Sequence, residues 1–280
     1  MKIIKFLLFF GIILFVSCNT LAQNKQIFVA MDDLPQSAIK ALTNNRNVKE
    51  LKIIYGDFIY KKGNKLIEEI FIKELTRLFP LSNSSGYVML DWEGQLYYDL
   101  IGNGVSITKK SNAASEFIKA IRIINNIRPN LKVGVYGLPN PRFDNYDQNS
   151  KKYLGEIFKY CDFIVPVFYL DNPNDEFDGQ LKAYSNFIYG QNISKPVYPI
   201  VWDRYSTTDG KYRSQQTGST KFVRTTKKLL QNKNFSGIIY WGRDSHFFGV
   251  EKAKNKMISN ENLHLQYKNR IINNTKNILK

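Results

Sequence analysis

Cysteine and histidine are scarce in this chain of 280 residues, which has two of each. Cys18 lies in the N-terminal segment and Cys161 in an apolar stretch, so a disulfide requires that Cys18 stays in the mature chain. The histidines, His246 and His264, stand far apart, with no metal-ligand spacing around either. The sequence therefore predicts neither a disulfide framework nor a Cys/His metal site, and we expect no metal or other cofactor.

Glycine-rich phosphate-binding motifs are missing as well. No G-x-G-x-x-G fingerprint follows an apolar run, and no G-x-x-x-x-G-K-[ST] loop is present. Both absences argue against a dinucleotide- or nucleotide-dependent enzyme. No low-complexity linker interrupts residues 24–280, which we expect to form one domain.

Acidic residues are outnumbered, 24 against 40 basic ones, which gives a formal net charge of +16. Nucleic-acid-binding proteins gather such charge on one face, whereas here the lysines are scattered along the chain. We therefore expect no nucleic-acid partner. Two interpretations of the excess stay open: a compositional bias of the whole chain, or attraction to a polyanionic substrate or an acidic surface.

The longest apolar run lies at the N-terminus, where residues 6–16 follow Lys2 and Lys5 and precede small and polar residues. This layout is typical of a secretory signal and is too short for a stable membrane span. We expect residues 1–23 to be a signal peptide, cleaved near Ala22, and the protein to be secreted, periplasmic or at the cell surface. A lipid anchor at Cys18 is the open alternative.

After this segment, apolar runs alternate with amphipathic stretches. Strands are predicted at 27–31, 51–55, 87–93, 131–136, 163–169, 197–202 and 237–241. Helices are predicted at 35–42, 65–79, 113–127, 150–160, 177–189 and 221–231, with a closing helix near the C-terminus and a polar loop over 94–108. Apolar strands that alternate with helices predict a parallel sheet covered by helices. The chain length favours a single closed β/α barrel of about seven strands, similar to a TIM barrel.

Within this pattern, the predicted strand 87–93 carries two carboxylates, Asp91 and Glu93, separated by Trp92. Side chains alternate along a strand, so both acids point to one side and Trp92 to the other. Two acids side by side on an apolar strand cannot both ionise easily, so one should have a raised pKa. A protonated general acid is one interpretation; a solvated strand end that caps a loop is the other.

Acids and aromatic residues follow several of the predicted strands. They are Asp33 after the first, Asp91 and Glu93 at the third, Tyr136 at the fourth, Tyr169 at the fifth, Trp202 and Tyr205 at the sixth, and Trp241 at the seventh. In a β/α barrel the carboxyl ends of the strands form the active-site face. Aromatic rings that stack on sugars, with carboxylates beside them, predict a carbohydrate cleft there.

Several segments resemble, in sequence order, the hyaluronidase family of glycoside hydrolases, the animal and venom enzymes that cut hyaluronan and chondroitin. Residues 90–93 (LDWE) match the catalytic I-D-W-E signature of that family, and 134–139 (GVYGLP) resemble its segment with Tyr, Gly and Pro in step. Residues 166–170 (PVFYL) and 237–242 (GIIYWG) are similar to two later strands of the family. The chain departs from the family pattern at Asn140, where a cysteine is expected, and at Asp33, where an asparagine is expected.

The resemblance implies a role for each matched position. Glu93 would protonate the glycosidic oxygen, while Asp91 and Tyr169 would orient the substrate's own 2-acetamido group as it closes onto the anomeric carbon. Tyr136 and Trp241 would line the pocket of the cleaved sugar. The implied partner is an anionic glycosaminoglycan, cut by a retaining, substrate-assisted endo-β-N-acetylhexosaminidase.

Two other functions stay open at this stage. A D-x-E barrel strand also occurs among lysozyme-like muramidases, which act on peptidoglycan. A non-catalytic carbohydrate-binding barrel is the second alternative, although both carboxylates, Asp91 and Glu93, are intact. Besides Tyr136 and Trp241, we expect Trp202, Tyr205 and Asp33 to bind substrate.

Overall fold

The computed structural model describes residues 25–61, 65–142, 146–189, 191, 193–206, 211–243 and 259–280. The expected signal peptide (1–23), with the anchor candidate Cys18, lies outside the described residues, and so does His246. Export and anchoring therefore stay predictions.

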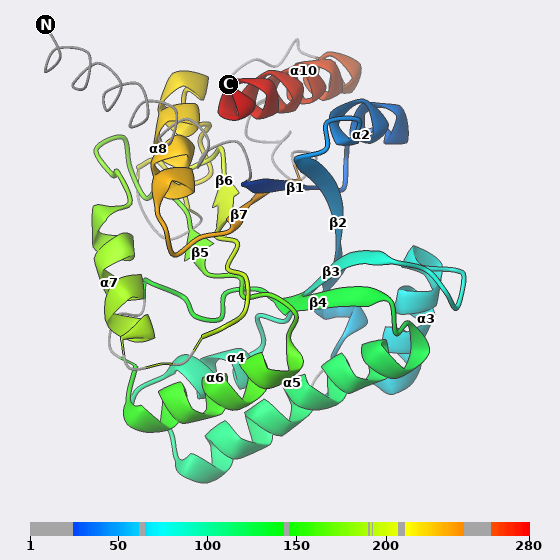
Figure 1. Cartoon of the computed structure of the whole chain (residues 1–280), viewed down its shortest axis with the longest axis vertical. Coiled ribbons are helices and arrows are strands. Elements are labelled where there is room, and N and C mark those ends of the chain that lie inside the picture. Colours follow the sequence, from blue (N-terminus) through cyan, green and yellow to red (C-terminus); the bar gives the residue numbers. More distant parts are fainter. Residues whose placement is uncertain are drawn as a thin grey trace, which may run out of the picture.

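Seven parallel strands form one curled sheet in the order β4-β3-β2-β1-β7-β6-β5 (Figure 1). They are β1 (Gln26–Met31), β2 (Val48–Tyr55), β3 (Gly86–Asp91), β4 (Leu131–Val135), β5 (Val167–Phe168), β6 (Ile200–Trp202) and β7 (Gly237–Gly242). Just after β4 and just before β5, an isolated bridge joins Tyr136 to Val165, and beside it the Gly137 N–H donates to the Val165 carbonyl over 3.0 Å. The predicted β/α barrel of about seven strands is confirmed.

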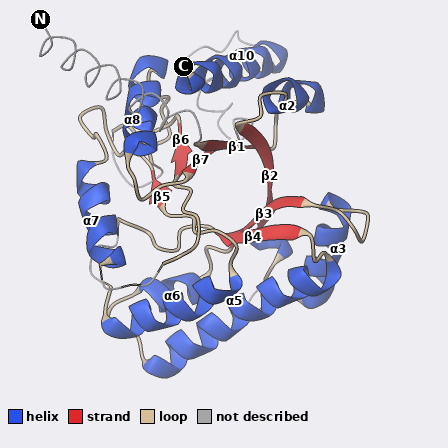
Figure 2. Ribbon diagram, viewed as in Figure 1, coloured by secondary structure: helices blue, strands red, loops and turns tan. Residues whose placement is uncertain are grey.

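Helices surround the sheet on its outer side (Figure 2). They are α2 (Gln36–Thr43), the 3₁₀ turn η1 (Gly56–Phe58), α3 (Glu68–Leu78), α4 (Gln95–Ile101), α5 (Ile107–Ile127), α6 (Gln148–Tyr160), α7 (Asp178–Ile188), α8 (Ser219–Gln231) and α10 (Asn260–Leu279). Of the helices in the described ranges, none is both long and apolar enough to cross a lipid bilayer.

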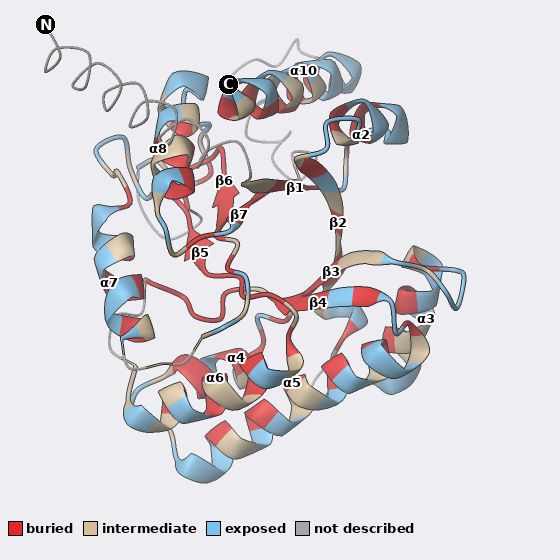
Figure 3. Ribbon diagram, in the orientation of Figure 1, coloured by how far each residue is buried: buried red, intermediate tan, exposed pale blue. Residues whose placement is uncertain are grey.

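The strands are buried on both faces (Figure 3). Along β1, Phe28 and Ala30 belong to the core inside the barrel, while Ile27, Val29 and Met31 belong to the core between sheet and helices. This two-sided burial explains why the strands are almost continuously apolar in sequence. A polar side chain inside the barrel therefore needs either a hydrogen-bond partner or a position where the interior opens to solvent.

Aromatic rings close the amino-terminal end of the barrel. The ring of Phe28 lies 4.5 Å from that of Tyr87, 4.8 Å from that of Tyr198 and 6.3 Å from that of Phe163, measured between centroids. A Cβ atom at Gly134 would lie 2.3 Å from the Phe163 ring, so only glycine fits beside it. With this end filled, the interior is left to open at the carboxyl ends of the strands.

The predicted polar loop over 94–108 is wrong, because this segment contains α4 and the first residues of α5. Tyr97, Leu100 and Ile101 are buried, which gives the short helix an apolar face that packs on the protein. Helix α5 begins at Ile107 instead of 113, where the Ser106 side chain accepts a hydrogen bond from the Lys109 N–H and caps the helix.

Lys110 holds α4, α5 and α6 together. Its side chain is fully buried, and its Nζ donates to the Gly102 carbonyl and the Ser150 hydroxyl, each over 2.6 Å. The Asp147 carboxylate lies 3.4 Å away. Lys110 therefore fixes α4, which carries two tyrosines of the cavity described below.

Lys110→Met should lower the free energy of unfolding by about 2 kcal/mol, because the buried oxygens that Lys110 contacts would lose their donor. Urea unfolding of both proteins measures the difference. Lys109→Met is the matched control, since Lys109 is the exposed neighbour on the same helix. Equal effects of the two substitutions would contradict a structural role for Lys110.

The C-terminal helix α10 is anchored to the ends of two strands. Arg270 Nε lies 2.6 Å from Oδ2 of the buried Asp203, to which the Tyr240 hydroxyl also donates over 2.8 Å. The Tyr267 hydroxyl donates to the Gly242 carbonyl over 3.0 Å. Asp203 and Gly242 directly follow the tryptophans at the ends of β6 and β7, so α10 supports one wall of the barrel mouth.

Candidate active site

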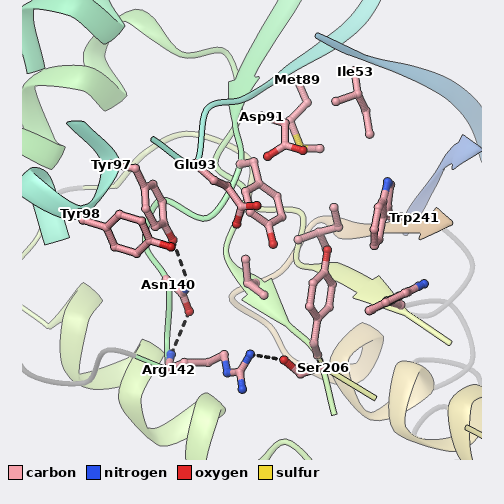
Figure 4. A pocket seen from close by; sticks show the side chains of 15 residues that line it. Ile53, Met89, Asp91, Glu93, Tyr97, Tyr98, Asn140, Arg142, Ser206 and Trp241 are labelled. Carbon is pink, nitrogen blue, oxygen red and sulfur yellow. Dashed lines mark hydrogen bonds between the residues drawn. The ribbon is translucent and has the colours of Figure 1, made fainter. Parts of the chain in front are cut away.

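A cavity of about 480 Å³ opens at the carboxyl ends of the strands (Figure 4). This volume falls in the usual range of ligand pockets. The residues lining it are Ile53, Met89, Asp91, Glu93, Tyr97, Tyr98, Tyr136, Asn140, Arg142, Val167, Tyr169, Ile200, Trp202, Ser206 and Trp241. Its aliphatic residues lie in the strands β2, β3, β5 and β6. Its polar residues lie at strand ends and in the segments that follow them.

The side chains of Asp91 and Glu93 both reach this cavity from the carboxyl end of β3. Asp91 is the last residue of the strand, and Trp92 is buried on the opposite side, with its ring 4.7 Å from that of Phe117 on α5. The packing of Trp92 between sheet and helix fixes the orientation of the segment. The two carboxyl groups consequently face the cavity together, as Figure 4 shows.

The pKa of both carboxyl groups is raised. At Asp91 burial is the main cause, Glu93 and Asp32 add repulsion, and Arg243 works in the opposite direction, so the pKa of Asp91 lies well above its ordinary value. Its Oδ1 atom is buried, with no hydrogen-bond partner among the described residues. Burial also raises the pKa of Glu93, although this side chain reaches solvent through the mouth and a hydrogen bond with Tyr136 lowers the value. The expected pKa rise is therefore found at both carboxyl groups, with burial as its main cause.

This raised pKa makes a prediction for stability. The folded chain keeps a proton on Asp91 at pH values where the unfolded chain, with an aspartate pKa of about 3.9, has lost it. The contribution of Asp91 to the free energy of unfolding is therefore present below about pH 4 and is lost as the pH rises through the raised value. Asp91→Asn should remove this loss, and unfolding measured against pH should show a shallower decline than in the wild type.

The control for this experiment is Asp57→Asn, which alters an exposed aspartate near the same end of the barrel. It should leave the decline as steep as in the wild type. An identical pH dependence in the Asp91→Asn protein and the wild type would show that Asp91 titrates at an ordinary pKa.

Three aromatic rings form one wall of the cavity. The ring centroids of Tyr169 and Trp241 lie 6.1 Å apart with planes at 20°, and the ring of Trp202 lies 4.9 Å from Trp241 and 5.7 Å from Tyr169. Burial raises the pKa of Tyr136 and of Tyr169 well above the ordinary value, so both phenols stay protonated. They can therefore act as neutral hydrogen-bond donors beside the two carboxyl groups.

The arrangement can protonate a bound ligand and stabilise positive charge that develops next to it. Glu93 is a carboxylic acid with a raised pKa that is reached by solvent, and Asp91 is a second carboxylate two residues away. Within the described ranges, no group of three or more His, Cys, Asp or Glu side chains is placed to hold a metal ion.

No protein-family model matches the chain, and no curated protein matches it. Several solved structures do match the chain. Bee venom hyaluronidase in complex with a hyaluronic acid tetramer aligns over 82% of this chain and 97% of its own, with 14% identity and a TM-score of 0.52. A GH128 (subgroup I) endo-β-1,3-glucanase from Amycolatopsis mediterranei, in complex with laminaritriose, aligns over 88% and 99%, with 14% identity and a TM-score of 0.45. A GH18 chitinase from Pseudoalteromonas aurantia aligns over 80% and 82%, with 15% identity and a TM-score of 0.43.

The chain shares its barrel fold with the bee venom enzyme. At 14% identity this likeness shows the fold alone, so the activity has to be argued from the residues of the cavity.

The structure brings most of the expected site residues together. Asp91, Glu93, Tyr136, Tyr169, Trp202 and Trp241 all line the cavity. Their chemical roles stay predictions.

Tyr205 and Asp33 are not among the residues that line this cavity. The main chain at Tyr205 pairs with the segment after it, through the Tyr205 N–H to the Gln215 carbonyl, and its ring packs 5.7 Å from that of Tyr212. The next residue, Ser206, faces the cavity in its place. At the end of β1, Asp32 instead of Asp33 approaches the site, because the Tyr55 hydroxyl donates a hydrogen bond to it.

Sequence reasoning missed two groups of residues that line the cavity, and also Tyr55 beside it. Tyr97 and Tyr98 lie on α4, in the segment expected to be a loop, and Asn140 and Arg142 lie in the segment after β4. Tyr55 ends β2 and accepts a hydrogen bond from Trp241 Nε1 over 3.3 Å, so it orients the tryptophan wall. Its position at a strand end, shared with Tyr136 and Tyr169, was the available signal.

Proposed function

We propose that the chain is a glycoside hydrolase that cuts polysaccharides internally at β-linked N-acetylhexosamine residues. The observation that carries this proposal is the pair Asp91 and Glu93, adjacent at the end of one strand and both in an aromatic-walled cavity. The proposed substrates are hyaluronan and chondroitin-type glycosaminoglycans. The formal net charge of +16 supports an anionic polymer over a neutral one.

The position of the two acids supports a substrate-assisted reaction. In the two-carboxylate scheme, the acid and the nucleophile flank opposite sides of the scissile bond. Asp91 and Glu93 instead come from one strand end, on one side of the cavity. The nucleophile in our proposal is accordingly the carbonyl oxygen of the substrate's own acetamido group.

In the first step, Glu93 gives its proton to the glycosidic oxygen while the acetamido oxygen bonds to the anomeric carbon. The leaving chain departs as an alcohol, and Asp91 accepts a hydrogen bond from the acetamido N–H as positive charge develops there. In the second step, water attacks the anomeric carbon, the bond from that carbon to the acetamido oxygen breaks, and the water gives a proton back to Glu93. The neutral phenols of Tyr136 and Tyr169 orient these groups.

The aromatic wall gives the cavity a surface suited to sugar rings. Trp241 is held by the bond of its Nε1 atom to Tyr55, and Trp202 is buried at the end of β6. Apolar faces of pyranose rings pack on such side chains, and their hydroxyl groups can be bound by residues such as Asn140 and Ser206. We further propose that the protein acts outside the cytoplasm, as the sequence of residues 1–23 indicates.

Incubation of the purified protein with hyaluronan, chondroitin and peptidoglycan, followed by measurement of new reducing ends, tests the proposal. New reducing ends from the glycosaminoglycans alone would support it. Release from peptidoglycan alone would indicate a muramidase. No release from any of the three, with binding retained, would indicate a carbohydrate-binding barrel.

A further inference from the structure

A single basic side chain, that of Arg142, is among the described residues that line the catalytic cavity. In Figure 4 it lies on the side of the cavity away from Asp91. An anionic sugar group would be attracted to Arg142, while Asp91 and Glu93 offer it no positive charge. The charges of the cavity therefore give a bound acidic chain one favoured placement.

Arg142 is held in a fixed position over the cavity. Its guanidinium donates to the hydroxyl of the buried Ser206 and to the carboxylate of Asp171. Its main-chain N–H donates to Asn140 Oδ1 over 3.1 Å, and Asn140 Nδ2 donates to the Tyr97 hydroxyl over 2.9 Å. A guanidinium fixed in this way loses little conformational entropy when it binds a ligand.

The Asp171 carboxylate already accepts a hydrogen bond from the Arg142 guanidinium. The side chain of Asp171 is 41% exposed and that of Arg142 is 20% exposed, so the pair lies at the mouth and not in the core. A carboxylate of the substrate is chemically equivalent to that of Asp171 and can compete with it for Arg142. Asp171 should thus weaken the binding of acidic chains that Arg142 favours.

Arg142 and Asp171 also line a second hollow of about 580 Å³, together with Asn172, Asn174 and Gln180. Because Arg142 lines both hollows, a chain that leaves the catalytic cavity in this direction passes its guanidinium. The group that meets Arg142 would then belong to the sugar next to the cleaved one. In chains that alternate N-acetylhexosamine with uronic acid, that neighbour carries the carboxylate.

We propose that Arg142 selects chains whose sugar next to the cleaved N-acetylhexosamine is acidic, and that Asp171 opposes this selection as an internal competitor. This inference rests on the proposed function, since it assigns the charge preference of the same site. It makes Arg142 a specificity-determining residue and requires opposite effects of substitution at the two positions.

The test compares two ligands in the Glu93→Gln background, where turnover does not consume them. The ligands are a hyaluronan oligosaccharide and the same oligosaccharide with its carboxyl groups reduced to alcohols, and calorimetry gives the Kd of each. We expect the acidic ligand to bind more tightly. We define the ratio as the Kd of the reduced oligosaccharide divided by the Kd of the acidic one. Arg142→Gln should reduce this ratio by about tenfold, since a charge-assisted contact with the acidic ligand is lost. Asp171→Asn should increase the same ratio.

Asp178→Asn is the matched control, because it removes the same charge from an exposed position on α7 that lines neither hollow. It should change the ratio less than Asp171→Asn does. If Arg142→Gln fails to fold, as judged by circular dichroism, the opposite shift expected for Asp171→Asn still decides the matter.

Three results would overturn the inference, and they differ in what else they affect. Equal weakening of both ligands by Arg142→Gln, or an unchanged ratio in Asp171→Asn, would exclude the charge selection while leaving the proposed hydrolase intact. Failure of the Glu93→Gln protein to bind either oligosaccharide would contradict the proposed substrate as well.

Discussion

Glu93→Gln is expected to lower the rate of hydrolysis by about 10²–10⁴-fold, the usual contribution of a general acid. The amide has nearly the shape of the carboxylic acid but cannot give a proton to the glycosidic oxygen. Glu93 also faces the cavity and is reached by solvent, so the substitution leaves no void in the core. The rate of reducing-end formation, measured with saturating substrate, gives the size of the effect.

A matched control separates loss of the acid from loss of the fold. Glu69→Gln makes the same chemical change at an exposed position on α3, away from the cavity, and should keep the wild-type rate. Circular dichroism and thermal unfolding should agree for the wild type and both variants. A folded Glu93→Gln protein that kept more than about a tenth of the activity would show that another group is the acid.

Asp91→Asn should reduce turnover by about 10²–10³-fold, the effect typical of removing one group that stabilises developing charge. Asp91 is half-buried beside Glu93, and its buried Oδ1 atom has no hydrogen-bond partner among the described residues, so it is available to the acetamido group of a substrate. An asparagine keeps the shape of the side chain but cannot take the negative charge that would stabilise the developing positive charge.

Inhibition distinguishes the role of Asp91 from that of Glu93. A thiazoline analogue of N-acetylglucosamine mimics the ring formed by the acetamido group and should inhibit the wild type. Asp91→Asn should weaken this inhibition together with turnover. Asp57→Asn, an exposed change near the same end of the barrel, should alter neither. Unaltered inhibition of a folded Asp91→Asn protein would contradict a contact between Asp91 and the acetamido group.

The position of the two acids could be predicted from sequence because it depends on local alternation. An apolar strand that ends in D-W-E directs Asp91 and Glu93 to one side and Trp92 to the other, whatever the rest of the chain does. The structure keeps this arrangement although β3 ends at Asp91, before the last two residues of the motif. The barrel could also be predicted from sequence, because the chain contains a series of apolar runs with helical stretches between them.

Other parts of the site depend on contacts that no local pattern reveals. Helix α4 has seven residues between Gly94 and Gly102, too few to be stable alone, and it forms because residues such as Tyr97 and Leu100 pack on the protein. Tyr205 was expected at the cavity, but pairing with the following segment turns Ser206 toward it instead. A shift of one residue after a strand end exchanges the side chain that faces the cavity with the one that faces away from it.

Arg142 is another residue of the site that could not be predicted from local sequence. It lies seven residues beyond the end of β4, and its place over the cavity depends on Ser206 and Asp171, which follow two other strands. Such contacts between loops are set by the closed barrel, which brings the carboxyl ends of its strands to one face. They become visible only once the fold is known.

The configuration of the first product tests the central claim most directly. Proton NMR of the anomeric region, recorded in the first minutes of hyaluronan cleavage, distinguishes the β-configured from the α-configured reducing end before the two interconvert. Attack by the acetamido group followed by water inverts the anomeric carbon twice, so the product should be β. An α-configured product would contradict the substrate-assisted reaction and indicate direct attack by water, activated by another carboxylate near Asp91, such as Asp32.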